Sequence, residues 1–173
     1  SGDGQTAEVG WNLSAAPTVS IRDASGHPVA GMTVRWRVIS GSEWTAGPSS
    51  VTDAEGIASM GWTLGYRVSP FDSLEASISP LVHATFRASA VLTAGSLFLR
   101  TGDGQTGVAG TPLGVHPTVV VETPSSDEFG GGGFNVEGVE VRWVVMDGGG
   151  STSAGSSLTA LDGVASINWI LGG

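Results

Sequence analysis

Three acidic turn residues are the side chains of this sequence best suited to binding a metal ion. Asp3 and Asp103 each lie in a Gly-Asp-Gly segment, and Asp53 lies three residues before Gly56. Clustered oxygen ligands of this kind could bind Ca²⁺. The same pattern also serves turn geometry, because Gly accepts a positive φ and an Asp side chain accepts hydrogen bonds from nearby backbone N–H groups. Turn geometry is the favoured interpretation, since the sequence contains no EF-hand loop.

Catalytic and transition-metal chemistry find little support in the sequence. His27, His83 and His116 are scattered along the chain, whereas metal ligands cluster. No Gly-x-Ser-x-Gly segment follows a strand and opens a helix, although a Ser-His-Asp triad could assemble from distant residues. The chain has no Cys, which excludes disulfides and thiolate metal sites. We therefore expect a protein that is not an enzyme, has no catalytic residues and needs no cofactor, with Ca²⁺ the one ion considered.

Four aromatic residues are candidates for binding a partner. Trp11 and Trp44 have no Trp at the matching positions of the internal repeat described below, and Phe129 and Phe134 flank a run of four glycines. Exposed aromatic rings anchor partners at interfaces. The alternative is that these rings pack beneath a loop or against a neighbouring module. The sequence leaves both interpretations open, so binding of a glycan or a surface receptor is a hypothesis.

The charge of the chain argues against two classes of partner. Its 173 residues include 7 basic residues, all of them Arg, and 16 acidic residues, which gives a net charge of −9. Phosphate binding depends on Lys and Arg contacts, so neither nucleic acid nor an anionic membrane surface is an expected partner. No apolar run approaches the roughly 20 residues that a membrane-spanning helix needs.

An internal repeat organises the chain. The matched segments are, in order, 1–6 with 101–106, 10–17 with 110–117, 34–38 with 141–145, and 54–65 with 161–172. The first two pairs lie 100 residues apart and the last two lie 107 apart. The second copy therefore carries seven extra residues, which we place in the loop 122–138. Such self-similarity indicates two structural modules of one kind.

Each copy consists of short segments in which apolar and polar residues alternate. In 32–38 every second residue is apolar, and 57–64 has a similar pattern. A period of two indicates strands with one buried face, and Gly, Pro and Asp separate them. Short strands at a spacing of about ten residues predict an all-β fold of two tandem immunoglobulin-like β-sandwiches. The tryptophans expected in the cores are Trp36, Trp62, Trp143 and Trp169.

These motifs together resemble the invasin/intimin-type bacterial immunoglobulin-like domain of group 1. The resemblance rests on SGDGQT at 1–6, Pro17 before a valine-containing strand, the turn 23–31, VRWRV at 34–38 and TDAEGIA at 52–58. The second copy departs from this pattern at 122–138 and 159–163. Membership of that family implies extracellular stalks, adhesins or surface lipoproteins, and it implies no catalytic residues.

The repeat predicts modules at 1–93 and 94–173, of which the second is incomplete. After its last matched segment the first copy continues through 67–100, which holds two further strands and the entry to the next module. The second copy has no counterpart of this stretch. We therefore expect its C-terminal strands to come from a neighbouring subunit or from the rest of a longer array.

The apolar residues of 67–100 indicate how much free energy of unfolding the second module lacks without a counterpart of this stretch. They are Val68, Phe71, Leu74, Ile78, Leu81, Val82 and Phe86. Burying one large side chain contributes about 1.5–3 kcal/mol, so losing four or five such residues would cost on the order of 10 kcal/mol.

Three functional hypotheses follow. The first is a non-enzymatic structural module of a bacterial surface stalk, adhesin or extracellular filament, acting in a homopolymer or a tandem array. The second is a carbohydrate- or receptor-binding adhesion module that uses Trp11, Trp44, Phe129 or Phe134. The third is an accessory domain of a secreted enzyme. All three place the protein outside the cell or at the bacterial cell surface.

Overall fold

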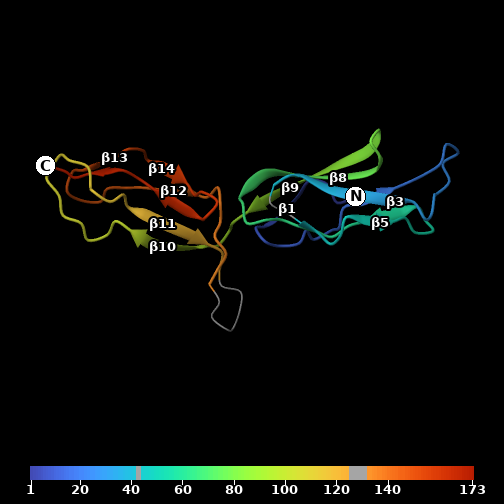
Figure 1. The fold of residues 1–173 in the computed structure, drawn as a ribbon, viewed down its shortest axis with the longest axis horizontal. Helices are drawn as coiled ribbons and strands as arrows, with labels where there is room; N and C mark the ends of the chain where they lie inside the picture. The colour runs from blue at the N-terminus through green and yellow to red at the C-terminus, as the bar shows by residue number, and fades with distance from the viewer. Residues whose placement is uncertain (42–43, 125–131) are drawn as a thin grey trace. The chain divides into compact units, whose positions relative to one another are not determined.

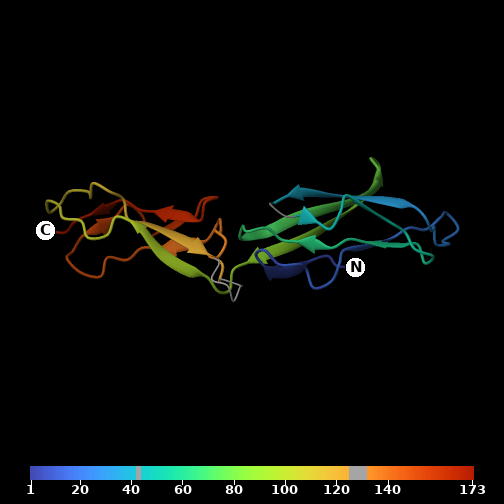
Figure 2. The same ribbon diagram turned by 60° about the horizontal axis from the view of Figure 1, so that its bottom comes forward.

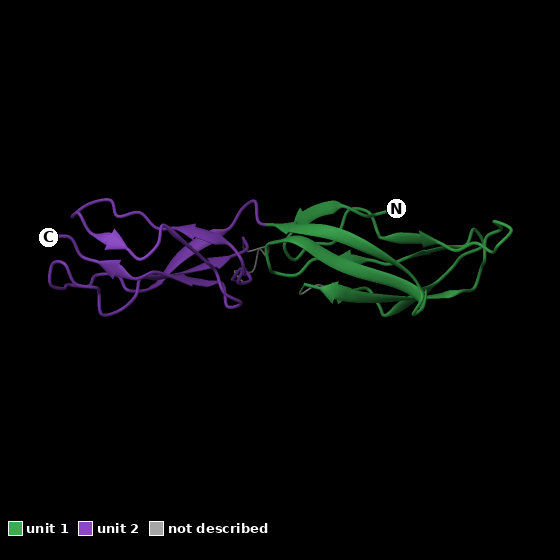
Figure 3. Cartoon of the chain, turned by 90° about the horizontal axis from the view of Figure 1, so that it is seen from above, with its two compact units in different colours: residues 1–91 green, residues 92–173 purple. Residues whose placement is uncertain are grey.

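The computed structural model describes residues 1–41, 44–124 and 132–173. Every regular element in this part of the chain is a β-strand, which confirms the all-β prediction. The chain divides into two compact units, Ser1–Val91 and Leu92–Gly173 (Figure 3). The division falls two residues before the expected one. Within the described ranges, no helix is long and apolar enough to cross a membrane.

Unit 1 is a two-layered β-structure. Its strands are β1 (Gln5–Glu8), β2 (Thr18–Ser20), β3 (Thr33–Ser40), β4 (Trp44–Thr45), β5 (Ser49–Val51), β6 (Ile57–Ser59), β7 (Trp62–Thr63), β8 (Ser69–Ser79) and β9 (Val82–Val91). One sheet has the order β1-β9-β8-β3-β5 (Figures 1 and 2). The second layer consists of the ladders β2-β6 and β4-β7.

The long β8–β9 hairpin completes the core of unit 1. Its central residues alternate between the core and solvent, which places Leu74 of β8 at 0% exposure and Phe86 of β9 at 6%. Trp36 of β3 is 4% exposed, and its ring centroid lies 5.9 Å from that of Phe86. Trp62 is 1% exposed. Two core tryptophans of unit 1 are therefore buried, one of them directly against the hairpin.

Unit 2 repeats much of this arrangement with fewer strands. They are β10 (Ser96–Thr101), β11 (Thr118–Glu122), β12 (Glu140–Arg142), β13 (Ser151–Thr152), β14 (Ser156–Leu158), β15 (Val164–Ser166) and β16 (Trp169–Ile170). They pair as β10-β11-β15, β12-β14 and β13-β16, and Figure 1 shows β10 beside β11. By the repeat, β11 to β16 correspond to β2 to β7, while β10 has no counterpart among the described strands of unit 1.

The repeated GDGQT motif is a structural turn in both units. The Gln5 side-chain amide donates to the carbonyls of Gly2 and Ala15, both at 2.7 Å, and its oxygen accepts the N–H of Ala15 at 2.9 Å. Gln105 makes the same three hydrogen bonds with Gly102 and Val115. A side-chain amide can satisfy several backbone groups at once, so one Gln holds each loop closed.

Candidate functional site

The candidate site is the part of unit 2 where strands present in unit 1 have no counterpart. β3 pairs with β5 over Thr33–Arg35 and with β8 over most of Arg35–Ser40. β12 matches only the first of these segments, and it pairs with β14 in the same register. Among the described residues nothing pairs with the other edge of β12, and 143–147 form no strand. Strand structure is lost where a pairing partner is lost.

The start of unit 2 shows the same effect. In unit 1, β1 pairs in parallel with β9 and with no other strand. The matching residues 105–108 form no strand. Within its described residues, unit 2 therefore lacks counterparts of both β8 and β9, as the repeat predicted.

An apolar cavity lies where the β8–β9 hairpin would pack. It has a volume of about 400 Å³, and its lining includes Trp143, Met146, Ile167 and Trp169. A second cavity of about 290 Å³ is lined by residues that include Leu97, Val121 and Val141. We call the lining of these two cavities the open face. Leu97 is 60% exposed and Met146 is 83% exposed, so apolar surface at both cavities faces solvent.

Trp143 and Trp169 are half-buried, which differs from the expectation that all four repeat tryptophans lie in cores. The Trp143 indole N–H donates to Ser157 Oγ at 2.9 Å, as that of Trp36 donates to Ser50 Oγ at 2.8 Å. The two rings are thus anchored alike. They differ in burial because no described residue of unit 2 takes the place of Phe86.

The acidic candidates serve backbone geometry in unit 1. Asp3 Oδ1 accepts the backbone N–H of Arg87 at 2.7 Å and so attaches β9 to the N-terminal turn. Asp53 Oδ1 accepts the N–H groups of Glu55 and Ile57 at 3.0 and 2.8 Å. Asp103 is exposed, and no hydrogen bond to it occurs in the described part of the chain. The described residues contain no group of three or more His, Asp or Glu that could hold a metal.

Three of the four aromatic candidates lie among the described residues, and all three are exposed. Trp11 is 68% exposed and Trp44 is 47% exposed, while Phe134 of unit 2 is 55% exposed. The Trp44 ring lies 6.5 Å from that of Tyr66, measured between centroids and tilted by 43°. Phe129 lies outside the described residues. Tyr66 is an aromatic residue that the sequence patterns do not mark, because its position carries no repeated Trp and no turn signal.

The Tyr66 ring lies close against Gly10, and the repeat offers a matched test of this contact. Gly10 has φ +79°, and a Cβ there would lie 2.4 Å from the Tyr66 ring. Its repeat partner Gly110 has φ +76° with nothing within 4 Å. We expect Gly110→Ala to cost about 1–2 kcal/mol from backbone strain alone, and Gly10→Ala to cost roughly 1–3 kcal/mol more from overpacking. Denaturant unfolding of both variants checks this, and equal losses would contradict the contact.

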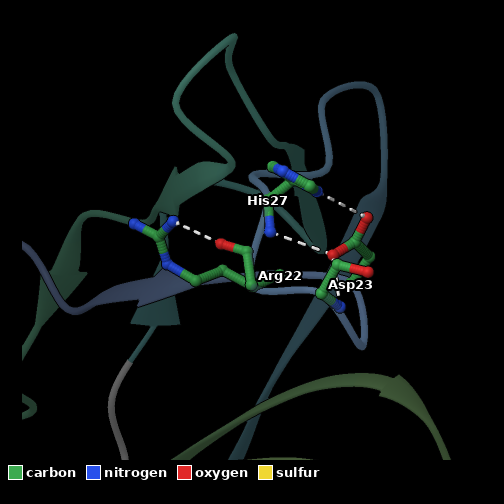
Figure 4. Close-up of polar contacts among 5 residues, drawn as sticks. Arg22, Asp23 and His27 are labelled. Atoms are coloured by element: carbon green, nitrogen blue, oxygen red, sulfur yellow. Dashed lines mark hydrogen bonds and ion pairs between the residues drawn. The ribbon is translucent and has the colours of Figure 1, made fainter.

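The turn at Asp23 contains a carboxyl group whose pKa is lowered from its ordinary value. Asp23 Oδ1 accepts the N–H groups of His27 and Ser25 at 2.9 and 2.8 Å, and Oδ2 lies 3.5 Å from His27 Nδ1 (Figure 4). Arg22 donates to the carbonyl of Gly26 at 3.0 Å, which closes the same turn. The His27 backbone hydrogen bond is the largest cause lowering the pKa of Asp23 below 3.8.

This lowered pKa predicts how the turn responds to acid. A carboxyl group whose pKa falls on folding stabilises the folded state at pH values above its ordinary pKa. This contribution is lost as the pH drops through the pKa of the folded state. We expect the order of the turn to weaken below pH 3.8, as the Asp23 carboxyl takes up its proton. NMR of the His27 and Ser25 amides against pH measures this. Asp23→Asn is the control, and its amides should not follow that titration.

Comparison with known proteins supports the fold. No protein-family model and no curated protein sequence matches the chain. Among solved structures, the Yersinia pseudotuberculosis adhesin InvE matches 96% of this chain at 16% identity with a TM-score of 0.59. The chain spans 48% of the InvE chain. The match to InvE covers both units, so the fold similarity is not confined to a single β-sandwich.

Two further structures are similar at lower scores. The D0-D1 domain of intimin matches 98% of this chain and 81% of its own, at 17% identity and a TM-score of 0.43. Invasin, described as a bacterial integrin-binding protein, matches 98% of this chain and 32% of its own, at 16% identity and 0.44. These scores are too low to carry an argument alone. The InvE match and the strand order together identify the chain as two tandem immunoglobulin-like β-sandwich units with the fold that the invasin/intimin resemblance implied.

Proposed function

We propose that this chain is a non-enzymatic structural module of a bacterial surface stalk or adhesin, working in an array of like modules. The observation that carries the proposal is the tandem pair of immunoglobulin-like units, whose fold is shared with an adhesin along almost the whole chain. Stacked modules of one kind suit a role in spacing a tip from a surface. The net charge of −9 favours solubility over adsorption to acidic envelopes.

The open face supports the array part of this proposal. An exposed sheet edge beside apolar surface invites pairing with a further strand. In unit 2 that edge is β12, next to the half-buried Trp143. We therefore propose that strands from a neighbouring module or subunit close unit 2 in the assembled protein.

Surface location is the direct test of the proposed function. An antibody raised against the chain should label intact cells of the organism that encodes it, and protease added to those cells should remove the label. Labelling that appears only after the cells are made permeable would contradict the proposal. The third hypothesis, an accessory role beside a secreted enzyme, predicts label in the culture medium instead.

A second candidate function is adhesion through the exposed aromatic residues. Trp11 at 68% exposure, with Trp44 beside Tyr66, offers flat rings that could stack on a sugar or anchor a receptor. If the chain has a purely structural role, beads coated with it should bind neither to glycan arrays nor to host cells. Binding that falls at least about tenfold in the Trp11→Ala/Trp44→Ala double variant, and not in Leu81→Ala, would favour this candidate.

A further inference from the structure

We propose that the open face of unit 2 binds a β-hairpin like β8–β9, with an aromatic residue that fills the Trp143 cavity, supplied by a polypeptide segment other than residues 1–173. This rests on the proposed function, since it names the chemistry of the strands that would close unit 2 in an array. The observations that carry it are the template in unit 1, the matching lining in unit 2 and the number of hairpins in the chain.

Unit 1 supplies the template for the docked register. Along β3, Trp36 faces Ala76 and Val38 faces Leu74 of β8. The repeat offset of 107 places Trp143 and Val145 at the same two positions. The first strand of the incoming hairpin should therefore present a small residue to Trp143 and a large aliphatic residue to Val145, in antiparallel pairing.

The open face carries the same kinds of apolar residue as the corresponding positions of unit 1. Apolar residues recur in kind at the repeat positions: Val34 and Val141, Met60 and Ile167, Trp62 and Trp169. In unit 1 the cover over Trp36 is the ring of Phe86. The cavity of about 400 Å³ beside Trp143 has room for such a ring. The second strand of the hairpin should thus carry an aromatic residue at the position of Phe86.

Asp103 provides a polar attachment point for the same strand. In unit 1, Asp3 Oδ1 accepts the N–H of Arg87, and the N–H of Gly4 donates to the Arg87 carbonyl at 2.9 Å. Both backbone groups of one β9 residue are thus held by the GDG turn. Asp103 occupies the place of Asp3, and no described residue bonds to it. A docked strand would donate a backbone N–H to Asp103, whatever its side chain, as Arg87 does to Asp3.

One position distinguishes the expected partner from β8 itself. Arg37 of β3 pairs with Glu75 of β8, with Nη2 and Oε1 3.4 Å apart. The repeat places Val144 at the position of Arg37, and Val144 is 74% exposed. A carboxylate beside Val144 would gain no ion pair. We therefore expect an apolar or β-branched residue in the partner at the position of Glu75.

A second copy of this chain does not fit the open face. Residues 1–173 contain one β8–β9 hairpin and two units that need one, so any assembly of this chain alone has fewer hairpins than units. Donating β8–β9 to another copy would expose Leu74 and Phe86, which are buried in unit 1. The hairpin must therefore come from a polypeptide segment outside residues 1–173.

The test titrates a synthetic peptide of residues 69–91 into the full chain. We expect saturation at one peptide per chain, with tryptophan emission moving to shorter wavelength as Trp143 and Trp169 lose water. Trp143→Ala in the chain, or Phe86→Ala in the peptide, should weaken binding at least about tenfold. Leu81→Ala in the peptide should bind unchanged, since Leu81 is 92% exposed at the hairpin tip. Glu75→Val in the peptide should bind about two- to fivefold more tightly.

Three results would overturn the proposal. Binding that Trp143→Ala leaves unchanged would move the site elsewhere. Polymerisation of the chain alone, seen by sedimentation, would show that a second copy does fit. The free peptide and the same residues appended after Gly173 are two ways of supplying the hairpin. If neither binds unit 2, then unit 2 does not accept a hairpin. These three results do not affect the surface-labelling test, because they are obtained with the purified chain and without cells. The hairpin proposal and the proposed function can therefore fail separately.

Discussion

Trp36→Ala should lower the free energy of unfolding of unit 1 by about 3–5 kcal/mol, whereas Trp143→Ala should lower that of unit 2 by only about 1–2 kcal/mol, since a half-exposed ring loses less on truncation. The two residues occupy the same repeat position, and each donates its indole N–H to a serine. They differ because Trp36 is 4% exposed and packs on Phe86, while Trp143 faces an open cavity.

The measurement is denaturant unfolding of each variant, followed by amide hydrogen exchange so that the loss is assigned to one unit. β3 amides report on unit 1 and β12 amides report on unit 2. Similar losses in the two units would mean that the core of unit 2 is already closed. The difference should disappear once a hairpin is bound to the open face.

Extending the chain with a second copy of residues 67–91 after Gly173 should stabilise unit 2 strongly. Residues 171–173 match 64–66, so this extension continues the repeat in register. The two large side chains at the positions of Leu74 and Phe86 would contribute about 3–6 kcal/mol through burial before the cost of ordering the backbone. The new strands would also extend β12 and pair its open edge.

The extension is checked by hydrogen exchange of the 143–147 amides and by acrylamide quenching of tryptophan. We expect new protection of those amides and reduced quenching of Trp143. The same extension carrying Phe86→Ala is the matched control and should recover only part of the gain. Unchanged exchange in 143–147 would show that the absent hairpin is not what leaves this segment without strand structure.

The structure corrects the expected contribution of the missing stretch. Of its seven apolar residues, only Leu74 and Phe86 are buried in unit 1, and Val68 is half-buried. Phe71, Ile78, Leu81 and Val82 are exposed, at 68%, 38%, 92% and 55%. The earlier figure on the order of 10 kcal/mol was therefore too high, because it counted residues at the hairpin ends that never reach the core.

The sequence by itself determined the all-β class, the two units and the absence of the last strands from unit 2. These follow from local information: alternation of apolar residues every second position, turn residues between segments, and one pattern occurring twice. The alternation and the turns can each be recognised within about ten residues, whereas the repeat is recognised by comparing segments 100 to 107 residues apart. The roles of Trp36 and Trp62 as core residues could be predicted for the same reason, since both lie mid-pattern in a strand.

Only the tertiary structure shows which residues at matching repeat positions have the same burial and the same hydrogen bonds. Trp36 and Trp143 both end the shared segment Val-Arg-Trp, yet the burial of Trp36 depends on Phe86, 50 residues further along in unit 1. Asp3 and Asp103 share the GDG turn, yet Asp3 bonds a strand that begins at Val82. Burial and hydrogen bonding depend on which distant strand lies opposite, and in this chain the strand that decides both is present in one unit and absent from the described part of the other.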